Sequence, residues 1–141
     1  MSVREFATVS VGEALPPRTI HVDRATLVRY AGASLDRNPI HWDETFAKEV
    51  GLPDVIAHGM WTMGAAIGIV ADWAGDAGAV LEYRTKFTKP VVVPREGGAD
   101  IEVSAAVTAL DADTRRATLE ITVKAADVKV LGRCLAVVAL A

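Results

Sequence analysis

The chain has 141 residues, the length of one domain with a substantial core and little room for a second. Apolar residues make up 51% of the chain and charged residues 23%, which is typical of a folded globular protein and excludes a disordered one. The formal net charge is -3, and no block of Lys and Arg stands out. A nucleic-acid partner or an anionic membrane surface is therefore not expected.

Features that bear on location point to the cytoplasm. The single cysteine, Cys134, excludes an internal disulfide and fits a reducing compartment. The opening residues lack a basic start followed by an apolar run, so no signal peptide is expected. The stretch 55–71 contains no Asp, Glu, Lys or Arg, but a membrane span needs roughly 20 predominantly apolar residues. This shorter stretch contains glycines and a histidine, so we expect a buried helix and no membrane partner.

The first half of the chain is predicted to be mainly helical. Residues 16–22 read as extended, and Asp23 then has the type and position of a helix N-cap. Apolar residues recur at helical spacing from 25 to 35, and Asp43 is predicted to cap a second, short helix. A third helix is expected from Gly59 to Trp73. It is apolar on all sides, which indicates burial in a core.

The second half changes to a period of two, which is typical of half-buried strands. Apolar residues alternate in 81–87, 101–107 and 119–123, with turn sequences between these segments. The last segment, 128–140, is more uniformly apolar, as expected of a strand covered on both faces. Helices followed by a meander of antiparallel strands predict a single α+β domain over 1–141, with the long helix packed on the sheet.

The stretch LDRNPIHW, at 35–42, carries an acid and an imidazole around an Asn-Pro pair. Pro39 disfavours a helical Asn38, so the loop can bring Asp36 and His41 to one point. An imidazole titrates near neutrality, and a carboxylate beside it can share a water or a substrate hydroxyl. The same residues equally fit a turn capped by Asp36 next to an interior histidine. The pattern alone leaves both interpretations open.

A second motif, HGM at 58–60, stands where the long apolar helix is predicted to begin. The first N–H groups of a helix lack internal partners, and the helix dipole adds positive potential there. Gly59 permits close approach of a ligand, so its N–H could stabilise a carbonyl that develops enolate charge. A glycine that only relieves crowding between helix and sheet fits equally well.

Together these motifs resemble the MaoC-like, or R-specific hydratase 2, family of the hotdog superfamily. SLDRNPIHWD contains the Asp-x-Asn-Pro-aliphatic-His pattern of that family, AHGMWTMG follows at 57–64, and YRTKFTKPVVVP follows in turn. The resemblance extends over the whole chain and is greatest to the catalytic B subunits of actinobacterial type II (3R)-hydroxyacyl-ACP dehydratases. It implies a hotdog fold, in which an antiparallel sheet wraps a long central helix.

The resemblance also implies roles for the motif residues. Asp36 and His41 would be the catalytic dyad for syn elimination of water from a (3R)-hydroxyacyl thioester, and Gly59 would supply an oxyanion-hole N–H. Asn38 would support the loop or the substrate, and His58 would be structural or supporting. The reaction needs no cofactor. Which member of the dyad acts at C2 stays open.

Two alternatives stay open beside the dehydratase of fatty acid elongation. An R-specific enoyl-CoA hydratase of polyester or β-oxidation metabolism would use the same dyad in the hydration direction. A non-catalytic acyl-binding hotdog subunit would have no need of Asp36 and His41. The expected substrate is an acyl-ACP or acyl-CoA thioester. An uncovered sheet edge predicts a homodimer, or a heterodimer with a second hotdog subunit.

The remaining candidates give weaker signals. His21, His41 and His58 have no metal-ligand spacing, so no metal site is predicted. Cys134 lies in an apolar strand and reads as an inert core residue. Four cations could contact the acidic surface of a carrier protein or the phosphates of coenzyme A, although a solvated strand face fits them equally well. These cations are Arg84, Lys86, Lys89 and Arg95.

Overall fold

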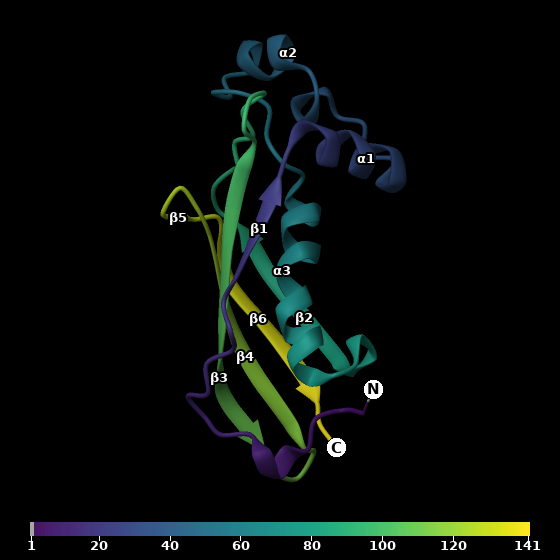
Figure 1. Ribbon diagram of the computed structural model, residues 1–141, viewed down its shortest axis with the longest axis vertical. Coiled ribbons are helices and arrows are strands. Elements are labelled where there is room, and N and C mark those ends of the chain that lie inside the picture. The colour runs from purple at the N-terminus through teal and green to yellow at the C-terminus, as the bar shows by residue number, and fades with distance from the viewer. Residues whose placement is uncertain (1) are drawn as a thin grey trace.

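The computed structural model describes residues 2–141 as an antiparallel sheet with one long helix lying along it (Figure 1). The α+β class and the central helix are as predicted. Three short 3-10 turns also occur: η1 (Phe6–Thr8), η2 (Pro39–His41) and η3 (Ala77–Ala79). The helices are α1 (Arg24–Ser34), α2 (Glu44–Glu49) and α3 (Gly59–Ala74). The strands are β1 (Arg18–Val22), β2 (Val80–Phe87), β3 (Ala99–Asp111), β4 (Arg116–Ala125), β5 (Val128–Lys129) and β6 (Leu131–Ala139).

Both predicted caps start helices. The Asp23 carboxylate accepts a hydrogen bond from the Thr26 N–H at 2.7 Å, and α1 begins at the next residue. The Asp43 carboxylate accepts from the Phe46 N–H at 3.1 Å at the start of α2. Such caps satisfy N–H groups that no helical carbonyl can reach. They fix where α1 and α2 begin, and therefore bound the loop that carries the Asn-Pro motif.

Helix α3 begins at Gly59 as predicted, but it is not buried on all sides. The sheet covers the face that carries Thr62, Ala66 and Ile69, whereas Met60 and Gly64 are exposed. One sheet can shield only one side of a helix, so the other apolar face remains uncovered in a single chain. Among residues 2–141, no helix is long and apolar enough to span a membrane.

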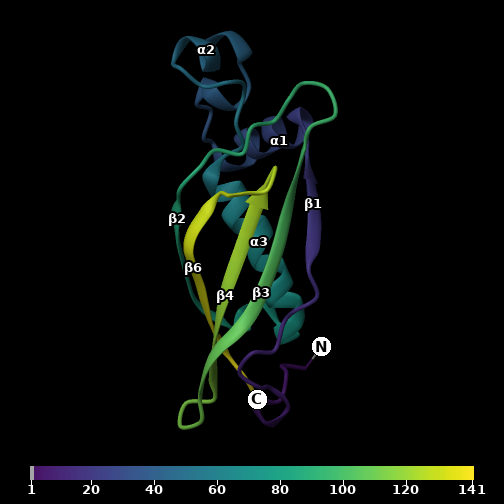
Figure 2. The same cartoon turned by 90° about the vertical axis from the view of Figure 1, so that its left-hand side faces the viewer.

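The strand order corrects the predicted meander. The sheet runs β1-β3-β4-β6-β2, all antiparallel, so β2 lies beside β6 and not beside β3 (Figure 2). Segment 128–140 is two strands rather than one, because β5 pairs with β4 and β6 begins two residues later. Only one face of β6 is fully buried, and its alternate residues are half-buried. The expectation of a strand covered on both faces was therefore wrong for the isolated chain.

Alternation holds in the central strands and fails at the edge. Ile101 and Val103 in β3, and Leu119 and Val123 in β4, point into the core as predicted. In β2, the predicted inward residues Leu81 and Phe87 are both exposed. The β2–β6 register is irregular between Val80 and Glu82, and the exposed Leu81 lies at this bulge. Phe87 lies opposite the buried Leu131 and so keeps the inward side of the strand, but 54% of it is exposed at the end of β2.

Candidate active site

The Asn-Pro motif forms a loop of tight turns, and side chains of the loop and of the end of α1 hydrogen-bond to its backbone. Helix α1 ends at Ser34, and the following residue, Leu35, has a φ of 63° that turns the chain sharply. The Asp36 N–H donates to the Ser34 hydroxyl, and the Asp36 carboxylate accepts from the Asn38 N–H, both at 3.2 Å. The Asn38 side chain accepts from the Ile40 N–H at 3.2 Å and so caps η2. These are the side chain–backbone bonds that Asp, Asn and Ser favour in turns.

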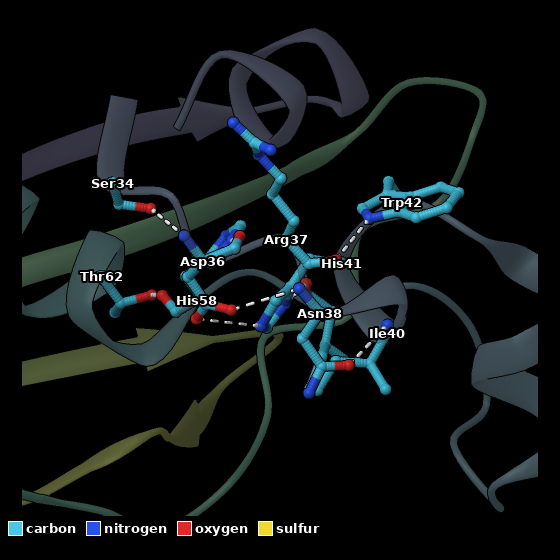
Figure 3. A network of polar contacts seen from close by, with 10 residues as sticks. Ser34, Asp36, Arg37, Asn38, Ile40, His41, Trp42, His58 and Thr62 are labelled. Carbon is cyan, nitrogen blue, oxygen red and sulfur yellow. Dashed lines mark hydrogen bonds and ion pairs between the residues drawn. The ribbon is translucent and has the colours of Figure 1, made fainter. Parts of the chain in front are cut away.

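The loop brings Asp36 and His41 together (Figure 3). The His41 ring is buried, and its Nδ1–H donates to the Ile56 carbonyl at 2.7 Å. This bond leaves the lone pair on Nε2, which lies 4.0 Å from Asp36 Oδ2. That separation is too long for a direct hydrogen bond and leaves room for a group that contacts both atoms. The Asp36 side chain is 55% exposed, so a substrate can reach it.

The backbone of Ile56 makes two hydrogen bonds to the motif loop, and these position His41. Its N–H donates to the Ile40 carbonyl at 3.2 Å while its carbonyl accepts from His41. On the other side, the Ala57 N–H donates to Val91 and the Val93 N–H donates to Val55, both at 2.9 Å. Segment 55–57 therefore acts as a short connecting strand between the motif loop and residues 91–93. It leads directly into α3.

The environment of His41 favours its neutral form. Burial is the main cause that lowers the pKa of His41 below its ordinary value, and the nearby His58 ring acts in the same direction. The hydrogen bond to Ile56 and the Asp36 carboxylate oppose this lowering but do not cancel it. A neutral imidazole with its lone pair on Nε2 can accept a proton near pH 7.

His58 contacts both Asp36 and His41. Its Nε2–H donates to the backbone carbonyl of Asp36 at 3.0 Å. Its ring stacks on His41 with centroids 3.7 Å apart and an interplanar angle of 21°, and it meets Tyr30 edge-on at 4.7 Å. The sequence predicted only a structural or supporting role for His58. The structure adds contact with both members of the predicted dyad.

A cavity of about 310 Å³ opens beside His41 at the start of α3. Gly59, Thr62, Phe87 and Leu131 contribute to its largely apolar lining, whereas Asp36 and Asn38 do not. A Cβ on Gly59 would stand 2.9 Å from the Phe87 ring, so a glycine here does relieve crowding against β2. Because Gly59 is the first residue of α3 and lines the cavity, the first N–H groups of the helix also lie beside the cavity. Sequence reasoning missed Phe87, because its alternation placed that residue in the core.

The remaining candidates are scattered. Lys89 lines the cavity, whereas Arg84 and Lys86 line a separate groove with Arg133, so the predicted cations form no single patch. Arg95 lies apart from them, near Trp42 and the start of α2. Cys134 is buried, and burial raises the pKa of its thiol. The prediction of an inert cysteine agrees with this position.

Three potential metal ligands do gather in the fold, although their sequence spacing gave no such signal. Atoms of Asp36, His41 and His58 that could bind a metal lie within 4.8 Å of one another. The two imidazole rings are stacked, however, and a zinc ion bound about 2.0–2.1 Å from a ring nitrogen lies close to the plane of that ring. One ion cannot take this position in two nearly parallel planes. The geometry does not fit a shared metal.

Comparison with known proteins identifies the family. Residues 6–127 match the MaoC like domain. The chain belongs to the MaoC-like family. It is 37% identical over 83 residues to 3-hydroxyacyl-thioester dehydratase X of Mycobacterium tuberculosis, which covers 59% of this chain and 29% of that protein. It is 33% identical over 111 residues to 3-hydroxybutyryl-CoA dehydratase of Methylorubrum extorquens, covering 78% of this chain and 68% of that protein.

Solved structures confirm the hotdog fold. A MaoC-like dehydratase superposes with a TM-score of 0.97 at 43% identity, covering 99% of this chain and 43% of that one. An (R)-hydratase from A. caviae involved in PHA biosynthesis gives 0.84 at 26% identity, covering 95% and 98%. The ChsH1-ChsH2 complex from Mycobacterium tuberculosis includes the same fold, with a TM-score of 0.80 at 20% identity over 94% and 99% of the two chains. This MaoC-like family chain thus spans less than half of some relatives and almost all of others.

We expect the pKa of His41 to lie below 6.5 and to fall further in Asp36→Asn, because the carboxylate favours the charged imidazole. NMR titration of the ring protons measures both values. Asp100→Asn is the matched control, because it removes a carboxylate beside a different histidine. The Asp100 carboxylate lies 2.7 Å from the ring of His21, a residue of β1. That control should leave the His41 titration unchanged. A His41 midpoint above 6.5, or a rise in Asp36→Asn, would contradict the electrostatic assignment.

Proposed function

We propose that this chain is a (3R)-hydroxyacyl thioester dehydratase that also runs in reverse as an enoyl thioester hydratase. The observation that carries the proposal is the 4.0 Å separation between His41 Nε2 and Asp36 Oδ2 beside an apolar cavity. Relatives named as dehydratases of 3-hydroxyacyl thioesters and of 3-hydroxybutyryl-CoA support it.

The dyad suits a syn elimination. Dehydration removes a proton from C2 and hydroxide from C3, and together these make one water. Two proton-accepting groups on the same side of the substrate can take the C2 proton and pass that same proton to the leaving hydroxide, so water is released and both groups return to the forms in which they started. The neutral His41 imidazole and the exposed Asp36 carboxylate have this arrangement.

Gly59 is proposed to stabilise the enolate. Removal of the C2 proton places negative charge on the thioester oxygen, and preorganised N–H groups in an apolar site stabilise such charge strongly. The Gly59 N–H lies in the first turn of α3, where the helix dipole adds positive potential. Gly59 and His41 line the same cavity, so one bound acyl group can meet both.

The substrate is proposed to be carried on coenzyme A or acyl carrier protein, with a second hotdog domain completing the site. The solved MaoC-like dehydratase chain is more than twice as long as this one, whereas the (R)-hydratase has nearly the same length. The uncovered face of α3 and the edge strand β2 are the apolar surfaces that a second domain would bury. A second copy of this chain and a separate, non-catalytic hotdog subunit both satisfy this need.

The size match to the (R)-hydratase favours one alternative function. That protein is described as involved in PHA biosynthesis, and this chain covers 98% of it. An R-specific enoyl-CoA hydratase would use the same dyad in the hydration direction. Rates on short and long acyl chains, each on coenzyme A and on carrier protein, distinguish the two functions.

Asp36→Asn and His41→Ala are each expected to reduce crotonyl-CoA hydration by at least about 100-fold, since each removes a proton-handling group. Circular dichroism should show an intact fold for both. Asp43→Asn is the control, because Asp43 belongs to the same segment but caps α2. It should keep near wild-type turnover. Near wild-type activity in both dyad variants would show that the dyad assignment is wrong.

Gly59→Ala is expected to lower kcat/KM because its methyl group blocks approach to the N–H. It also forces the Phe87 ring to move, since the new Cβ would stand 2.9 Å from it. The double variant Gly59→Ala/Phe87→Ala separates these causes by relieving the crowding alone. Its steady-state rate should stay well below that of Phe87→Ala. Recovery to the Phe87→Ala rate would mean that Gly59 serves packing only.

Native mass spectrometry is expected to show an assembly larger than the 14.9 kDa chain, either with itself or after co-expression with a second hotdog subunit. Leu81→Asp places a charge on the exposed edge strand β2 and should shift the assembly toward monomer. Val11→Asp, which introduces the same charge at an exposed valine away from β2, should not. A fully active wild-type monomer would contradict the need for a second domain.

A further inference from the structure

His58 is a buried polar residue that the proposed chemistry does not use. Only 1% of it is exposed, and it is one of three buried polar or charged residues among residues 2–141. It occupies the N-cap position of α3, yet its side chain makes no capping hydrogen bond. An imidazole costs more to bury than an apolar side chain of similar size. Its contacts should therefore explain why a histidine is present.

The hydrogen-bond pattern shows which ring nitrogen of His58 is the donor. Its Nε2 faces the Asp36 carbonyl, which can only accept, so Nε2 carries the proton. Its Nδ1 is buried without a hydrogen-bond partner. Nε2–H is therefore the donor that this site uses, and Nδ1 faces the protein interior.

The bond to Asp36 anchors residues 35–38, the part of the motif loop that is otherwise held only locally. The other hydrogen bonds made by residues 35–38 run to neighbours within five positions in the sequence. The bond from His58 spans 22 positions and connects the Asp36 backbone to the start of α3. The same ring supports one face of His41. His58 thus contacts both the backbone of Asp36 and the imidazole ring of His41 (Figure 3).

We propose that His58 is a positioning residue that sets the separation between Asp36 and His41. The proposal rests on the dyad function proposed above. His58 holds the Asp36 backbone with a fixed donor, while its ring keeps the His41 Nε2 directed toward the carboxylate. Reacting groups misplaced by about 1 Å can lose about 100-fold in rate, so a single anchoring bond is sufficient to matter.

The chain allows a matched test of the donor. In His58→Gln the side-chain amide nitrogen stands as far along the side chain as Nε2, so the bond to the Asp36 carbonyl can be kept. In His58→Leu the volume is largely kept and the donor is lost. With crotonyl-CoA as substrate, His58→Leu should lower kcat by about 100-fold with little change in KM, because the defect lies in the alignment of the dyad. His58→Gln should recover most of that loss.

A double variant tests whether His58 acts through Asp36. If it does, adding His58→Leu to Asp36→Asn should lower the residual rate little further, because the group being positioned is already gone. Independent, multiplicative losses would overturn the proposal, and so would equal losses in His58→Leu and His58→Gln. A rise in KM at constant kcat would instead indicate a role in binding.

The outcomes also separate this proposal from the dyad itself. An active Asp36→Asn variant would reject the dyad, whereas an inactive Asp36→Asn beside a fully active His58→Leu would reject only the positioning role. Circular dichroism and thermal unfolding check each fold. If His58→Leu does not fold, His58→Asn takes its place, because its shorter amide cannot reach the Asp36 carbonyl. Wild-type kcat in His58→Asn would then overturn the proposal.

Discussion

The hydrogen bonds on both sides of segment 55–57 are the constraint on which the site depends. One side of this segment binds the backbone and ring of the motif loop through Ile56, and the other binds residues 91–93. The segment then continues through His58 into α3. The histidine, the cavity wall and the helix N-terminus are therefore positioned by one continuous piece of backbone. A change in its register would move all three together, which explains how an exposed loop can carry an aligned pair of groups.

The packing of α3 sets a second constraint, on assembly. A single sheet covers one face of this helix, and the opposite apolar face is left with exposed Met60 and Gly64. Apolar surface of this kind is buried in a partner or remains an aggregation hazard. The edge strand β2 also has unpaired backbone groups and the exposed side chains of Leu81 and Phe87, and a partner would cover these as well. Because Phe87 also lines the cavity, the surface proposed for assembly is continuous with the proposed site.

Local signals predicted local structure well and long-range pairing poorly. The caps at Asp23 and Asp43, the start of α3 at Gly59 and the alternation in β3 and β4 depend on neighbouring residues, and all could be predicted. The placement of β2 beside β6 depends on contacts between segments far apart in the sequence, which periodicity does not encode. The exposure of Phe87, which lies opposite the buried Leu131 at the end of β2, likewise depends on which distant segments cover it in the fold. His58 was noted from its motif, but its stacking on His41 depends on the tertiary fold.

The motif loop shows why the sequence supported two interpretations of Asp36. One carboxylate oxygen, Oδ1, accepts the Asn38 N–H and winds the turn, while Oδ2 faces the His41 ring. The turn and the proposed dyad are therefore compatible, because a different oxygen of the one carboxylate is used for each. The bond at Oδ1 restricts the rotation of the side chain, so it reduces the entropy that would be lost when Oδ2 meets a substrate hydroxyl. The bond that winds the turn thus also holds Oδ2 in place for the proton transfer proposed for Asp36.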